Sequence, residues 1–133
     1  MLRFCLAVLL AVAVLGLQAA AQTTAGTSNP IGVWRGTSKC LVRPSPCHDE
    51  VTVYRITGTK TADSVSLDAL KIVNGQEEDM GVLGCKVVAQ GASLTCTMPH
   101  GVWRFAVRGD SLLGELRTPD NVKFRDVRAI RSR

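Results

Sequence analysis

The sequence lacks the patterns that identify most enzymes directly. It contains no Gly-rich phosphate loop, no nucleophile elbow and no set of cysteines and histidines at metal-ligand spacing. No segment has a sustained helical period, and no apolar run after residue 21 is long enough to cross a bilayer. We therefore expect no catalytic residue, no metal ligand, no cofactor and no membrane span in the mature chain.

An unbroken basic stripe is also missing, although the formal net charge is +5 at pH 7. Eight basic residues lie between positions 104 and 133, but Asp110, Glu115, Asp120 and Asp126 alternate with them. Charges of alternating sign are typical of solvated strand faces rather than of a nucleic-acid interface. We expect no nucleic-acid partner.

The first 21 residues have the organisation of a secretory signal peptide. Arg3 provides the basic start, residues 4–17 form the apolar run, and three alanines end in a small-residue cleavage site. The alternative is an uncleaved membrane anchor, for which the apolar run is short. We predict a secreted or periplasmic protein with a signal peptide at 1–21, a flexible N-terminal segment at 22–30 and one domain at 31–133.

Signal cleavage removes Cys5 and leaves four cysteines in the mature chain. Four cysteines in a short exported domain are typical of a disulfide framework, for which three connectivities exist. Cys40 and Cys47 flank a Pro-rich loop, and Cys85 and Cys96 face each other if residues 90–91 form a hairpin turn. We predict these two local disulfides. A metal site built from the same thiols would require reduced cysteines in an oxidising compartment.

The mature chain reads as a series of short strands separated by turn signals. We predict eight strands, at about 32–42, 48–57, 64–73, 80–89, 93–98, 102–108, 111–118 and 122–130. The third strand changes its apolar parity between Leu67 and Leu70, which indicates a β-bulge.

One hairpin between residues 103 and 116 fixes the register of the second half. A Gly109-Asp110 turn pairs Trp103 with Leu116 and Phe105 with Gly114 on an apolar face. The opposite face then pairs Arg104 with Glu115.

The next connection, residues 119–121, suits a three-residue loop with Asn121 in the left-handed conformation. That loop sets Leu116 opposite Phe124 inside the sheet and Glu115 opposite Arg125 outside it. The same parity directs Asp126, Arg128 and Ile130 inward.

Eight sequential antiparallel strands with one apolar face predict an all-β fold. Closing the meander into an up-and-down barrel buries that face and removes both sheet edges. A two-sheet sandwich of the same strands is the alternative.

Gly32-Val33-Trp34 at the start of the first strand, together with an arginine on the last strand, resembles the lipocalin-like (calycin) barrels. In that superfamily an arginine near the end of the last strand packs across the tryptophan and closes one end of the barrel. The resemblance implies that Arg128 is the partner of Trp34, with Arg125 as the second choice. It also implies a non-catalytic role in binding a small apolar ligand, and relatives among small secreted bacterial proteins.

A ligand carried at the barrel mouth would contact inward side chains, and we predict Leu94, Trp103 and Phe105 as lining residues. The alternative function is a protein-interaction module, because the chain also resembles small periplasmic barrels that inhibit secreted proteases. In that case residues 22–30 would enter the protease cleft. Neighbouring His48, Asp49 and Glu50 form the one cluster with catalytic residue types, but alternation along a strand turns neighbours to opposite faces.

Overall fold

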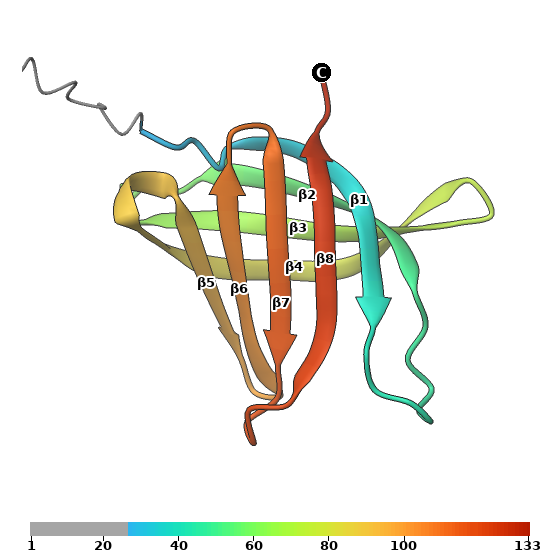
Figure 1. The fold of residues 1–133 in the computed structure, drawn as a ribbon. Coiled ribbons are helices and arrows are strands. Elements are labelled where there is room, and N and C mark those ends of the chain that lie inside the picture. The colour runs from blue at the N-terminus through green and yellow to red at the C-terminus, as the bar shows by residue number, and fades with distance from the viewer. Residues whose placement is uncertain (1–26) are drawn as a thin grey trace, which may run out of the picture.

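The computed structural model describes residues 27–133, which form a closed antiparallel β-barrel (Figure 1). The strands within this range are β1 (Gly32–Cys40), β2 (Glu50–Gly58), β3 (Ser64–Val73), β4 (Gln76–Val88), β5 (Ser93–Met98), β6 (Gly101–Arg108), β7 (Ser111–Arg117) and β8 (Lys123–Arg131). Each strand pairs with the next, and β8 pairs with β1. The predicted up-and-down barrel is confirmed, whereas the predicted signal peptide lies outside the described residues.

The β6–β7 hairpin has the predicted register. Trp103 pairs with Leu116, Phe105 with Gly114, and the turn places Gly109 at a φ of 58°. A Cβ on Gly114 would lie 2.5 Å from the Phe105 ring, so the ring covers this glycine from the barrel interior. Turn chemistry and cross-strand pairs specify the same register, which is why the sequence is informative here.

The β3–β4 hairpin is longer than predicted because Asn74-Gly75 forms its turn, with φ angles of 50° and 79°. β4 therefore begins at Gln76, and the turn end of the β3–β4 hairpin extends beyond the rest of the barrel (Figure 1). The expected bulge is present. Ala69 pairs with Gly81 and Leu70 with Asp79, so Met80 is the extra residue, and it lies on β4.

The β7–β8 hairpin differs from the predicted register by one residue. The predicted loop forms, with Asn121 at a φ of 65° and Arg117 opposite Lys123, but Leu116 then pairs with Arg125. Phe124 is bulged out of the pairing, and a one-residue slip exchanges the two faces of a strand. Arg125 consequently faces the interior, while Arg128 and Ile130 face solvent.

The barrel end at the start of β1 is closed by Trp34, which is fully buried. Its indole Nε1 donates a hydrogen bond to the Pro30 carbonyl at 2.9 Å, and the Arg131 guanidinium lies over its ring. The prediction that Arg128 covers Trp34 is wrong, because the Phe124 bulge turns the Arg128 side chain to solvent, where it is 77% exposed. Arg131, three residues after Arg128 on the last strand, covers the tryptophan instead.

The N-terminal segment is described only over residues 27–30, and this part contacts the closed end. Arg131 donates hydrogen bonds of 2.6 Å to the carbonyls of Asn29 and Ile31. A Cβ on Gly91 would clash with the Ser28 carbonyl, so the segment lies directly against the β4–β5 turn. These contacts attach residues 28–31 across the end that Trp34 fills.

Both predicted disulfides are present, Cys40–Cys47 and Cys85–Cys96. The second joins β4 to β5 inside the core, with its Cα atoms 4.2 Å apart, near the spacing of a non-hydrogen-bonded pair. The β4–β5 connection permits this spacing because it is not a two-residue turn. It includes the short 3-10 segment η1 (Ala89–Gly91), and the strands resume pairing at Val88 and Ser93.

Candidate functional site

A cavity of about 230 Å³ lies inside the barrel at the end opposite Trp34. This mouth is where β1, β5 and β7 end and where β2, β6 and β8 begin. The closed half of the barrel is filled by a buried cluster that includes Trp34, Ile56, Leu94 and Leu112. The cavity therefore occupies the half of the interior that side chains leave open.

The cavity exists because small residues face each other in one part of its wall. On β3 and β4, Leu67 pairs with Leu83, but the next inward pair toward the mouth is Ala69 with Gly81. Gly81 has a φ of 109°, a conformation that glycine adopts easily, and it follows the bulged Met80. The bulge thus places the smallest side chains of the cavity wall beside the mouth.

Aromatic rings from β2 and β6 also line the cavity. Trp103 and Phe105 stack with ring centroids 5.4 Å apart, and Tyr54 meets Phe105 edge to face at 5.5 Å. Of the three residues predicted to line a ligand site, Trp103 and Phe105 border this cavity, whereas Leu94 does not, because it is completely buried beneath them in the core. Met98 at the end of β5 completes this wall near the mouth.

One side of the mouth carries an ion pair that the sequence did not reveal. The Arg125 guanidinium lies 3.5 Å from the Glu50 carboxylate, and both side chains are largely buried. Arg125 Nη1 also donates hydrogen bonds to Ser38 Oγ at 3.1 Å and to the His48 carbonyl at 3.0 Å. Arg125, Glu50 and Ser38 all border the cavity, and we call these three residues the polar pole.

Tyr54 adds a neutral polar group to the cavity wall. Burial raises the pKa of Tyr54 to about 12, so its hydroxyl remains protonated at neutral pH. A protonated phenol can donate and accept a hydrogen bond. The cavity therefore combines apolar walls with a few polar groups, the usual composition of a small-molecule site.

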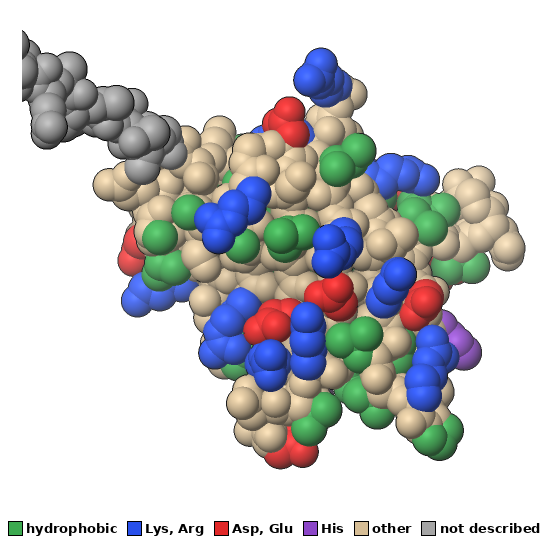
Figure 2. Space-filling view, viewed as in Figure 1, with side chains coloured by type: hydrophobic (Ala, Val, Ile, Leu, Met, Phe, Trp, Pro, Cys, Tyr) green, Lys and Arg blue, Asp and Glu red, His purple; other side chains and the backbone are tan. Residues whose placement is uncertain are grey.

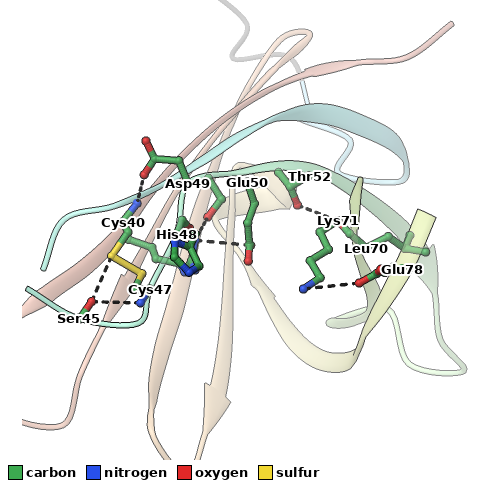
Figure 3. A network of polar contacts seen from close by, with 12 residues as sticks. Cys40, Ser45, Cys47, His48, Asp49, Glu50, Thr52, Leu70, Lys71 and Glu78 are labelled. Carbon is green, nitrogen blue, oxygen red and sulfur yellow. Dashed lines mark hydrogen bonds and ion pairs between the residues drawn. A yellow bond between two sulfur atoms is a disulfide. The ribbon is translucent and has the colours of Figure 1, made fainter. Parts of the chain in front are cut away.

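His48, Asp49 and Glu50 do not act toward a common point. Asp49 accepts a hydrogen bond from the Cys40 backbone N–H at 2.9 Å and lies 3.3 Å from Arg43, whereas Glu50 points away from it (Figure 3). Asp49 thus stabilises the loop that the Cys40–Cys47 disulfide closes, whereas Glu50 belongs to the polar pole. Within residues 27–133, no group of three or more His, Cys, Asp or Glu side chains is arranged to hold a metal ion.

Charges of both signs are interspersed on the outer face of β7 and β8 (Figure 2). Glu115 lies 2.9 Å from Arg117 and 3.8 Å from Lys123, and Asp126 lies 2.9 Å from Lys123. The hydrogen bond from Arg117 lowers the pKa of Glu115 below its ordinary value. The basic residues of this region are therefore compensated by neighbouring carboxylates.

In the described part of the chain, no helix is long and apolar enough to cross a membrane. No family model fits the chain, and no curated protein matches it in sequence. The architecture, an eight-stranded up-and-down barrel with its cavity at one mouth, is consistent with a calycin-like fold.

Proposed function

We propose that this protein is a non-catalytic, exported binder of a small apolar ligand, with a lipocalin-like mode of binding inside the barrel. The observation that carries this proposal is the cavity of about 230 Å³ with apolar walls at one mouth. Eight-stranded barrels either fill their interior with side chains or hold one small ligand there. In this barrel, side chains fill one half of the interior, and the other half has room for one small ligand.

The cavity volume limits the size of the ligand. Pockets for drug-sized molecules usually measure about 300–1,000 Å³, so a cavity of about 230 Å³ is below that range. At about 30 Å³ for each water-sized group, it accommodates roughly eight heavy atoms. We therefore propose a short acyl or alkyl chain, or a single ring, as the ligand class.

The proposed export is supported by the sequence and by the disulfides. Residues 1–21 have the pattern of a signal peptide, and the four remaining cysteines form two disulfides, which persist in oxidising compartments. The proposed absence of catalysis is supported by the cavity lining, in which the carboxylate of Glu50 is already paired with Arg125.

Titration with linear 1-alkanols of four to twelve carbons tests the proposal, with Trp103 fluorescence as the signal. We expect saturable quenching and an affinity that rises with chain length and stops rising near eight carbons. The best dissociation constant should lie between about 1 and 100 µM, or roughly −8 to −5.5 kcal/mol. Trp34 should not respond, because it lies at the closed end. Trp103→Phe should therefore abolish the signal.

Ala69→Phe provides the matched test of location, because its ring would occupy the cavity beside Gly81. Val82→Phe adds the same ring on the outer face of β4, where Val82 is 63% exposed, and should leave binding unchanged. Retention of full affinity in Ala69→Phe would place binding elsewhere. If no alkanol binds, the carrier proposal is wrong, and the protein-interaction module becomes the better candidate.

A further inference from the structure

The polar pole combines one positive and one negative side chain at the edge of an apolar cavity. Arg125 is 14% exposed and Glu50 is 21% exposed, and they approach to 3.5 Å. They come from opposite sides of the β1 strand, since β2 carries Glu50 and β8 carries Arg125. Because β1 lies between them, the pair also joins the two strands across the seam of the barrel.

The charge of Arg125 is already compensated within the protein. Its Nη1 atom contacts Glu50, Ser38 Oγ and the His48 carbonyl, all of which are acceptors. Glu50 is the one carboxylate and Arg125 the one guanidinium among the residues that line the described cavity. The Tyr54 hydroxyl, another polar group among the lining residues, is neutral.

This balance has opposite consequences for charged and neutral head groups. A carboxylate that approached Arg125 would also approach Glu50, and like charges at short distance in a partly buried site repel each other. An ammonium that approached Glu50 would meet the same difficulty with Arg125. A hydroxyl group brings no charge and can both donate to a carboxylate and accept from a guanidinium or phenol.

We propose that the site selects an apolar ligand with one neutral hydrogen-bonding head group, and that Glu50 is the residue that excludes carboxylates. This inference rests on the proposed function and names the ligand class of the same site. Glu50 acts as a specificity determinant because it occupies the place next to Arg125 that a ligand carboxylate would need.

The experiment compares 1-octanol, octanoate and octylammonium as ligands of the mature protein at pH 7.5. We expect 1-octanol to bind at least tenfold more tightly than either ion. In Glu50→Gln the octanoate affinity should rise at least tenfold relative to 1-octanol, because the amide keeps the shape but removes the negative charge. In Arg125→Gln the octylammonium affinity should rise in the same way.

Glu77→Gln is the matched control, since Glu77 also pairs with an arginine, Arg55, but lies on the surface. It should leave the order of the three ligands unchanged, and 1-octanol binding reports that each variant is folded.

If octanoate binds wild-type protein more tightly than 1-octanol, the carrier function stands and this inference is wrong. An unchanged ratio in Glu50→Gln also overturns it. If none of the three ligands binds, the proposed function itself fails. The wild-type order tests the selection of a neutral head group even if both variants at the polar pole are unstable.

Discussion

Arg131 lies over the indole ring of Trp34, with its guanidinium carbon 4.2 Å from the ring centroid. The two residues pair directly across the seam where β8 meets β1. The same guanidinium donates hydrogen bonds to the carbonyls of Asn29 and Ile31. One side chain therefore connects the last strand, the first strand and the segment that precedes it.

Arg131→Ala should lower the free energy of unfolding by about 1–3 kcal/mol, because it removes a cation–π contact and two hydrogen bonds from a charged donor. Trp34 emission should shift to longer wavelength as water reaches the ring. Urea titration followed by fluorescence measures both effects. Arg128→Ala is the control and should cost less than about 0.5 kcal/mol, since its side chain is exposed. The reverse order of the two variants would mean that the register of β8 is wrong.

The two disulfides should contribute differently to stability. The double variant Cys85→Ser/Cys96→Ser should lose about 3–5 kcal/mol, because it removes a covalent link and places two hydroxyls in the core cluster. The double variant Cys40→Ser/Cys47→Ser should lose less, about 2–3 kcal/mol, since this link closes a loop at the mouth. Urea titrations of both variants measure the difference. Peptide mapping without reduction should find no fragment that joins the two pairs.

Gly36→Ala should destabilise the barrel seam strongly. A Cβ at position 36 would lie 1.9 Å from the Arg128 carbonyl oxygen and 2.5 Å from the Ala129 Cα, so the backbones of β1 and β8 would have to separate. We expect a loss of at least about 2 kcal/mol of unfolding free energy. Gly58→Ala is the control, because nothing lies within 4 Å of the added methyl group. Equal stabilities of the two variants in thermal unfolding would contradict the close approach of β1 and β8.

Glu115→Gln should destabilise the protein in a manner that depends on pH. The hydrogen bond from Arg117 lowers the pKa of Glu115 in the folded state. Its stabilising contribution is therefore present above the ordinary glutamate pKa of about 4.3 and disappears as the pH falls through the lower folded value. At pH 7 we expect a loss of roughly 0.5 kcal/mol, because the pair is partly exposed. Urea titrations should show that wild-type protein and Glu115→Gln differ less in unfolding free energy at pH 3 than at pH 7. A larger difference at pH 3 would contradict the lowered pKa of Glu115.

The number of strands and the register of the β6–β7 hairpin follow from local signals in the sequence. The Gly109-Asp110 turn and the pairs beside it predict β6–β7 correctly, because the turn type and the inward residues specify the same register. Asn74-Gly75 carries an equally strong turn signal, and recognising it would have extended β4 to Gln76. These features depend on residues close together in the chain.

The candidate site was only partly predictable because it depends on two extra residues, Met80 and Phe124. A bulge changes which face every later residue of its strand occupies, and no local pattern marks the bulge at Phe124. Trp103 and Phe105 were predicted as lining residues since their register comes from the hairpin. Because the bulge at Phe124 was not predicted, Arg125 was assigned to the outer face and Arg128 was assigned to Trp34. Both assignments are wrong.

Closure of one barrel end by Trp34 and Arg131 has a kinetic consequence for any ligand of the cavity. Entry and departure must use the same passage, at the mouth bordered by Met80 and Met98. A substitution that narrows this passage without touching the bound molecule slows association and dissociation by the same factor, so the equilibrium constant stays constant. Residence time and affinity can therefore be changed separately, the first at the mouth and the second in the wall formed by Ala69 and Phe105.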